Sequence, residues 1–353
     1  MLDSRLQAFR RVFPFVLVLF AQLGSSGGSG AVQAQCSPPF GGTIFIDPDI
    51  ITPADPTTFI DAPYAGQGMR YVYDRRVGWI WMNAYLFNAS FDDGLTAEVQ
   101  VNPEFGSEAA ASAVALEYGS AVGQLPTSLR TDVDALWIHQ GVEPFGGGNN
   151  SILIHTGQAA IYVSSGILEE TLVHEAAHTS LDATHGSAPG WLAAQSADNC
   201  FISTYAQDFP NGEDVAESFL PYLAAEFRAD RISASLGQTI TNSIPNRIAY
   251  FNAQPLDLYP ITPALITFRR GDCNVDGATD IADAIFSLNT LFGSSIQVCP
   301  DACDANDSGT INIADPIYYL SILFQGFPSL PPGSCGPDPT ADGLDCPGFT
   351  ACP

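Results

Sequence analysis

Short runs of β-branched and aromatic residues, interrupted by turn-forming residues, fill the chain from residue 36 to about residue 100, and two more such runs follow an Ala-rich stretch. Runs of this kind favour strands. We expect strands at residues 71–73, 77–81, 135–139 and 151–155. Ala-rich or amphipathic stretches favour helices, and we expect these at residues 108–122, 167–183 and 212–235. The glycines at 146–148 indicate a turn between the last two strands. These elements predict an α+β domain.

The most apolar segment near the start of the chain is a predicted signal peptide. Arg5, Arg10 and Arg11 precede the apolar run Val12–Leu23, and small residues follow it. This run is shorter than the ~20 apolar residues that a membrane-spanning helix needs. We therefore favour a cleaved signal peptide at residues 1–34 over a membrane anchor. The mature protein is expected to be secreted, extracellular or at the cell surface, with no membrane span.

The charge of the chain excludes several classes of partner. Its 353 residues include 38 acidic residues against 12 Arg and no Lys, a formal net charge of −26. Proteins that bind nucleic acid need clustered cations to displace counterions, and an anionic membrane surface makes the same demand. The hydrophobic content of 46% is too high for a disordered chain. We expect a folded protein that binds neither nucleic acid nor a membrane surface.

The composition changes near residue 266, where we place a domain boundary. Beyond it Asp, Cys and Gly become frequent and Glu disappears. Two of the eight cysteines precede the boundary and six follow it, so each part of an exported chain can close its own disulfides. We expect a first domain over residues 35–266 and a second over residues 267–353. Residues 35–130 are either an integral part of the first domain or a separate segment.

The most informative motif lies in the expected helix at residues 167–183. His174 and His178 are four residues apart, so they share one face of the helix and can bind one metal ion. Glu175 lies beside them, where it can accept a proton from a metal-bound water. This pattern predicts one catalytic zinc ion, with Glu175 as the general base.

A catalytic zinc ion usually has three protein ligands, and two residues compete for the third position. Glu213 lies at the start of a second helix, with Glu217 one turn later on the same face. We expect Glu213 to ligate zinc and Glu217 to accept a hydrogen bond from a ligand imidazole. The alternatives are the reverse assignment and an ordinary acidic helix start that the helix dipole favours. The competitor His185 follows His178 by seven residues. The metzincin pattern needs six residues and a Gly where Leu181 stands.

These residues resemble the motifs of gluzincin metallopeptidases, most closely those of the anthrax lethal factor type. That type has the pattern HExxHxxxD, which Asp182 completes, and a Tyr before a Glu-x-x-Ala-Glu segment. Here Tyr205 precedes the segment from Glu213 to Glu217, with a gap one residue longer than in that family. The resemblance covers residues 165–232. It implies a zincin-like fold, with a small, mostly antiparallel sheet and active-site helices, and a secreted zinc-dependent peptidase acting on proteins or peptides.

The resemblance also implies roles for the surrounding residues. Tyr205 would donate a hydrogen bond to the oxyanion, or else be a packed aromatic side chain. Asp182 would orient a neighbouring group or cap its helix. The strand Ile152–His155 would be the sheet edge that aligns a substrate backbone. The rival interpretation is a calcium-organised surface or scaffold protein with a structural or inactive zinc site, although a structural site has no use for Glu175.

Two loops in the second domain repeat one pattern of oxygen-bearing residues. Each has oxygen donors at positions 1, 3, 5, 9 and 12, a Gly at position 6 and an available backbone carbonyl at position 7. This is the ligand pattern of calcium-binding loops. The first loop offers Asp272, Asn274, Asp276, Ala278, Asp280 and Asp283. The second offers Asp304, Asn306, Ser308, Thr310, Asn312 and Asp315. We expect each loop to bind one structural Ca²⁺.

The repeat resembles a dockerin-type tandem calcium module, because an Asp at position 12 precedes an apolar helix in both loops. The resemblance implies a small α-helical, EF-hand-like domain and a cohesin-like partner. The additional cysteines and the 32-residue spacing between the loops differ from the usual compact repeat. A calcium-stabilised domain without a partner is therefore the alternative.

Overall fold

The computed structural model describes residues 36–43, 48–198, 200–263, 266–340, 342–346 and 348–352. The predicted signal peptide at residues 1–34 lies outside them. Among the helices within these ranges, none has both the length and the apolar character that crossing a membrane requires.

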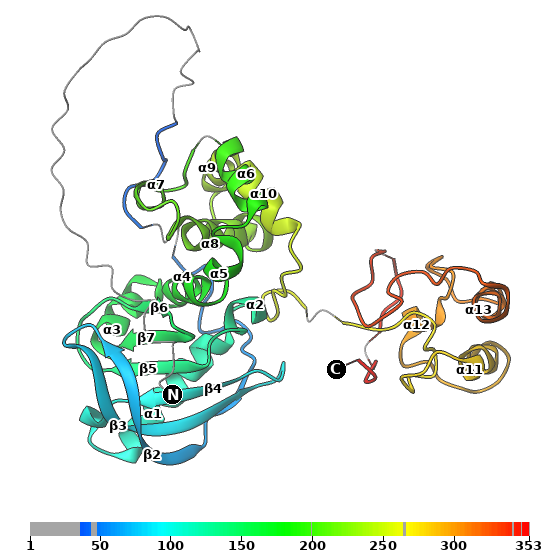
Figure 1. Ribbon diagram of the computed structural model, residues 1–353, viewed down its shortest axis with the longest axis horizontal. Helices are drawn as coiled ribbons and strands as arrows, with labels where there is room; N and C mark the ends of the chain where they lie inside the picture. The colour runs from blue at the N-terminus through cyan, green and yellow to red at the C-terminus, as the bar shows by residue number, and fades with distance from the viewer. Residues whose placement is uncertain are drawn as a thin grey trace, which may run out of the picture. The chain divides into compact units, whose positions relative to one another are not determined.

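One mixed sheet organises the first part of the chain (Figure 1). Its strands lie in the order β1-β3-β4-β5-β7-β6, and β2 also pairs with β3. The pairs β4–β5 and β5–β7 are parallel, whereas the other pairs are antiparallel. The strands are β1 (Phe59–Asp61), β2 (Tyr64–Asp74), β3 (Gly78–Phe91), β4 (Thr96–Val101), β5 (Ala135–His139), β6 (Gly146–Gly148) and β7 (Ser151–His155).

Helices from the same part of the chain complete an α+β architecture, which confirms the expected fold class at this level. The α-helices are α1 (Glu108–Gly123), α2 (Thr127–Arg130), α3 (Thr156–Ser165), α4 (Leu168–Ser180), α5 (Asp182–His185), α6 (Pro189–Asp198), α7 (Thr204–Asp208), α8 (Asp214–Phe227), α9 (Ala234–Ser243) and α10 (Pro245–Asn252). Two short 3-10 helices are η1 (Pro103–Phe105) and η2 (Ala229–Arg231).

The edge of the sheet differs from the sequence-based expectation. β5 and β7 have the bounds predicted from their apolar runs, but the glycines at 146–148 form strand β6 rather than a turn. β6 pairs antiparallel with β7, so β7 lies between β5 and β6. The prediction that Ile152–His155 is the edge strand is therefore wrong. Three glycines give no strand signal, because they lack the side chains from which strand propensity arises.

Two expected helices are shorter than predicted. The helix expected at residues 167–183 is α4, which ends at Ser180, and α5 then begins at Asp182. The helix expected at residues 212–235 is α8, which ends at Phe227. α1 follows its expected bounds closely, and the Ser107 side chain caps its start by accepting a hydrogen bond from the Ala110 N–H.

One large hydrophobic cluster packs the helices against one face of the sheet. Phe87 from β3, Leu136 from β5 and Ile152 from β7 are fully buried there, together with Leu172 from α4 and Phe219 from α8. Burial of each such side chain contributes about 1.5–3 kcal/mol. Strands that precede α1 in the sequence and strands that follow it belong to the same sheet and the same hydrophobic cluster. Residues 59–155 therefore form a single structural framework. This framework holds α4 and α8 in place.

The last part of the chain contains α11 (Ile281–Phe292), α12 (Pro300–Cys303) and α13 (Ala314–Gln325). α11 and α13 pack around a small buried cluster that includes Ala284 and Tyr319. All eight cysteines are paired, and each of the two expected groups pairs within itself. The disulfides are Cys36–Cys200, Cys273–Cys303, Cys299–Cys346 and Cys335–Cys352.

Candidate metal centre

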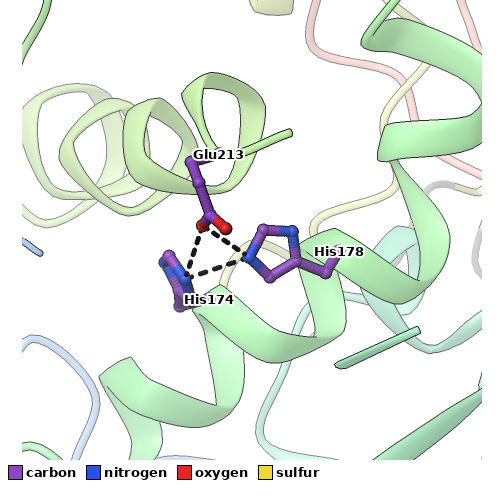
Figure 2. A group of neighbouring side chains, drawn as sticks. All are labelled: His174, His178 and Glu213. Carbon is purple, nitrogen blue, oxygen red and sulfur yellow. Dashed lines mark hydrogen bonds and ion pairs between the residues drawn. The ribbon is translucent and has the colours of Figure 1, made fainter. Parts of the chain in front are cut away.

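Three side chains from two helices meet at one point (Figure 2). His174 and His178 lie four residues apart on α4, and Glu213 is the residue before α8. The two imidazole Nε2 atoms are 3.1 Å apart. The Glu213 Oε2 atom lies 3.1 Å from His178 Nε2 and 3.7 Å from His174 Nε2. The structure thus brings together the three residues that the sequence singles out as zinc ligands, and we call this group the metal triad.

Carboxylates lie beside the other nitrogen of each imidazole. His178 Nδ1 is 2.8 Å from Asp182 Oδ2, and His174 Nδ1 is 3.7 Å from Glu217 Oε1. The Ser203 hydroxyl donates a hydrogen bond to the second oxygen of Glu217. A carboxylate at Nδ1 holds the imidazole proton there and leaves the Nε2 lone pair available. When a metal ion takes the place of the second proton on His178, both Nε2 atoms would direct their lone pairs at the point where the three side chains meet.

Buried ion pairs fix the start of α8, from which Glu213 reaches the histidines. The Arg247 side chain is fully buried, with its Nε 2.8 Å from Asp214 Oδ2 and its Nη1 2.9 Å from Asp198 Oδ2. Asp214 directly follows Glu213 in the chain. Because removing one partner of a buried pair costs several kcal/mol, the backbone at Glu213 has little freedom to move. α8 also packs directly against α4 (Figure 1).

The charges at the metal triad favour one cation. Burial and, to a smaller extent, the neighbouring His178 together lower the pKa of His174 to about 3, so this imidazole stays neutral. Burial also lowers the pKa of His178, but its hydrogen bonds to Asp182 and Glu213 outweigh burial and raise that pKa to about 10. The cluster therefore attracts a single positive charge, which a metal ion can supply in place of the proton.

The residues of the metal triad fit a zinc ion. Two neutral imidazole nitrogens and one carboxylate oxygen are a common ligand set of catalytic zinc, which keeps a fourth position for water. Lone pairs that face each other at 3.1 Å repel unless a proton or a cation lies between them. Carboxylates such as Asp182 and Glu217, which lie beside the two Nδ1 atoms, commonly orient zinc-bound histidines.

Glu175 lines the same cleft as the metal triad. The Gly147 N–H in β6 favours the ionised form of the Glu175 carboxylate. Burial raises the pKa of Glu175 to about 6, while the nearby His178 and Arg75 act in the opposite direction. The carboxylate is therefore ionised at neutral pH, yet basic enough to accept a proton from a bound water.

Tyr205 extends from α7 toward the metal triad. Its hydroxyl donates a hydrogen bond to Glu213 Oε1 at 3.2 Å. Burial and the Glu213 charge raise the pKa of Tyr205 to about 12, so the hydroxyl keeps its proton and remains a donor. Its place in the cleft gives it access to a bound substrate.

The cleft has a volume of about 560 Å³ and contains residues that sequence reasoning missed. Arg75, in the turn between β2 and β3, donates a hydrogen bond to the Phe145 carbonyl beside β6. Its neighbour Arg76 pairs instead with Asp74 and Glu104. Nothing in the local sequence distinguishes the two arginines, because only the pairing of distant strands brings one of them to the cleft.

The other histidines lie outside the metal triad. His185 Nδ1 is 2.8 Å from the Tyr250 hydroxyl. His139 and His155 are fully buried at the ends of β5 and β7, where each lies within 4 Å of Asp74. The structure therefore does not bring His185, the metzincin-like alternative, to the zinc ligands.

The two expected calcium loops form matching hydrogen bonds. In the first loop, Asp272 at position 1 accepts hydrogen bonds from the N–H groups of positions 5 and 6, and Asp283 at position 12 accepts them from positions 3 and 9. In the second loop, Asp304 and Asp315 accept hydrogen bonds from the same four positions. The glycine at position 6 has a positive φ in both loops, which allows the sharp turn there.

No protein-family model, curated protein or solved structure matches the chain.

Proposed function

We propose that the chain is a secreted zinc-dependent peptidase with a zincin-like catalytic domain and a dockerin-like calcium module. The observation that carries the proposal is the convergence of the metal triad beside Glu175 in an open cleft. A structural zinc site is usually closed by four protein ligands, whereas this group offers three and has a general base beside it. Zinc bound there would polarise the scissile carbonyl and lower the pKa of a bound water toward ~7.

The protein groups divide the remaining work. Glu175 accepts the proton from the attacking water and passes it to the leaving amine. The Gly147 N–H favours the ionised form of Glu175, which is the form that accepts this proton. The Tyr205 hydroxyl, held within reach by Glu213, donates a hydrogen bond to the developing oxyanion. Asp182 and Glu217 keep the imidazoles in the tautomer that ligates zinc.

The cleft suits an extended peptide. Gly146, Gly147 and Gly148 line it, and they form strand β6 at the edge of the sheet. Glycines let a substrate backbone approach closely, and an edge strand can pair with an added strand. Arg75 is the single Arg or Lys among the described lining residues and offers a donor for a substrate carbonyl or carboxylate.

The two repeated loops are proposed to bind one structural Ca²⁺ each. The carboxylates at positions 1 and 12 lie close together in each loop, and neither loop contains an Arg or Lys to balance their charge. A Ca²⁺ ion bound by the loop oxygen atoms would offset the repulsion between these carboxylates. The resemblance to dockerins makes a cohesin-like protein the candidate partner of this module.

The test compares wild type with Glu175→Gln in zinc content and in the digestion of casein and a peptide library. We expect one zinc per chain in both proteins and a loss of about 10²–10⁴-fold in kcat for the variant, the usual contribution of a general base. Glu117→Gln, an exposed change on α1, is the matched control and should keep full activity. Unchanged hydrolysis by Glu175→Gln would refute this mechanism. Zinc binding without hydrolysis of any substrate would favour the calcium-organised scaffold.

A further inference from the structure

A third acidic segment near the end of the chain has the spacing of the first half of a calcium loop. Asp338, Thr340 and Asp342 occupy positions 1, 3 and 5, and Gly343 occupies position 6. The N–H of Leu344 at position 7 donates to Asp342 Oδ1 at 2.7 Å, as position 7 does to position 5 in the first loop. Unlike the glycines of the two loops, however, Gly343 has no positive φ, so the chain does not turn there in the same way.

A buried carboxylate from another segment completes this group. Asp301 in α12 is only 3% exposed, and one carboxylate oxygen each from Asp301, Asp338 and Asp342 can lie within 4.8 Å of one another. These three residues, with Thr340 and Asp345, line a cavity of about 260 Å³. Within the described part of the chain, Asp301 Oδ1 accepts no hydrogen bond. A buried carboxylate oxygen left in this way is costly unless a ligand satisfies it.

One arginine balances only part of this charge. Arg270 donates a hydrogen bond to Asp338 at 2.7 Å and forms an ion pair of 3.0 Å with Asp307. Its nearest approach to Asp301 Oδ1 is 4.0 Å, beyond hydrogen-bond distance. The four carboxylates of the cavity therefore exceed the positive charge beside them.

Covalent and polar contacts hold these repelling groups together. The disulfide Cys299–Cys346 joins the start of α12, which carries Asp301, to the segment that follows Asp342. The Thr340 hydroxyl donates to Asp307 Oδ2 at 2.7 Å, and Asp307 belongs to the second calcium loop. The cluster is thus built from two segments about 40 residues apart and fixed against the neighbouring loop.

We propose that Asp301, Asp338 and Asp342 form a third calcium site, in addition to the two loops. The donors are oxygen atoms only, which favours a hard cation over zinc. Ca²⁺ takes six to eight oxygen ligands in irregular geometry, so the Thr340 hydroxyl, Asp345 and water can complete its shell. Mg²⁺ demands near-ideal octahedral geometry, which a site split between two segments does not favour.

The test counts calcium ions on the full chain by equilibrium dialysis, after chelation and reloading with one equivalent of zinc. We expect three Ca²⁺ per chain in wild type and two in Asp342→Ala, with excess Mg²⁺ failing to displace the third. Asp342 is exposed, so its truncation spares the core. Asp230→Ala, an exposed change in η2, is the matched control and should retain three ions.

Asp301→Asn provides a second measure, with circular dichroism to confirm folding. We expect it to weaken the third ion about tenfold or more and to leave the other two unchanged. If Asp301→Asn fails to fold, Asp342→Ala decides the question alone. Two ions in wild type, or a count that is the same in wild type and Asp342→Ala, would overturn the proposal. The outcome does not depend on whether the chain is a peptidase.

Discussion

At the scale of single residues, the candidate metal centre depends on two carboxylates that lie beside the Nδ1 atoms of the imidazoles, opposite the Nε2 atoms that would bind the metal. Asp182 lies in α5 beside Nδ1 of His178, and Glu217 lies in α8 beside Nδ1 of His174. They set the tautomer and the ring orientation, so a small change at either residue alters the ligand nitrogen that the metal would meet. The same logic separates Glu213, which faces both Nε2 atoms, from His185, which faces Tyr250.

This difference predicts the ranking of two substitutions by zinc affinity. Glu213→Ala removes one of the three proposed zinc ligands and should weaken zinc binding by more than the ~10–100-fold typical of losing a residue that only orients a ligand. His185→Ala should leave zinc affinity unchanged, although it removes a contact with Tyr250. Competition titration with a chromogenic chelator measures both. A larger loss in His185→Ala than in Glu213→Ala would move the third ligand to His185.

The sequence predicted the histidine pair from local spacing, because residues four apart share one face of a helix. Glu213 comes from a separate helix, and its place beside the histidines follows from the resemblance to gluzincins rather than from spacing. Arg75 could not be predicted in this way, because its position in the cleft depends on the pairing of β2 with β3 and of β6 with β7. The third acidic group was missed for the same reason, since Asp301 and Asp342 come from separate segments.

At the scale of elements, the contact between β6 and α4 determines the shape of the cleft. A Cβ atom at Gly147 would lie 1.9 Å from the backbone carbonyl oxygen of Glu175, so only glycine permits this approach. The Gly148 N–H also donates to the Thr179 hydroxyl on α4 at 2.8 Å. The glycines for which the sequence indicates a turn therefore form the strand that lies directly against α4.

Gly147→Ala should consequently impair both stability and activity. The added methyl group must displace β6 or α4, and overpacking of this kind costs about 1–3 kcal/mol of unfolding free energy. A shift of Glu175 by about 1 Å should lower kcat about 10²-fold. Urea unfolding and peptide hydrolysis measure the two effects.

Gly237→Ala, in α9 and outside the cleft, is the matched control for this change. Its Cβ atom would meet the Ile232 side chain at an ordinary contact distance of 3.5 Å, and Gly237 has no positive φ. We expect its activity to equal that of wild type and its stability to be equal or slightly higher, because Ala favours a helix over Gly. Equal losses of stability and activity in the two variants would show that the close approach of Gly147 to α4 is not the cause of either loss.

At the scale of the whole molecule, the acidity has two distinct origins. Residues 267–353 contain eleven Asp, no Glu and two Arg, a net charge of −9. Three calcium ions would reduce this to −3, so much of the charge in this part is accounted for by proposed metal ligands. The acidic residues of the first part are mostly unrelated to the metal triad, and they suit a soluble exterior. Nothing in the structure explains the absence of Lys.

Calcium should therefore stabilise the two parts of the chain unequally. The buried clusters around Phe268 and Tyr319 are small, whereas the cluster around Phe87 and Leu172 is large. When the free Ca²⁺ concentration is 100 times the Kd of a site, binding adds about 2.7 kcal/mol to the free energy of unfolding. A domain with a small core depends more on such a contribution.

In calorimetry of zinc-loaded protein, added Ca²⁺ should raise the temperature of one unfolding transition and leave the temperature of the other unchanged. The combined Asp283→Asn and Asp315→Asn variant should lose most of that rise, because both loops lose their position-12 carboxylate. A single transition that shifts as a whole would instead mean that the two parts unfold as one cooperative unit.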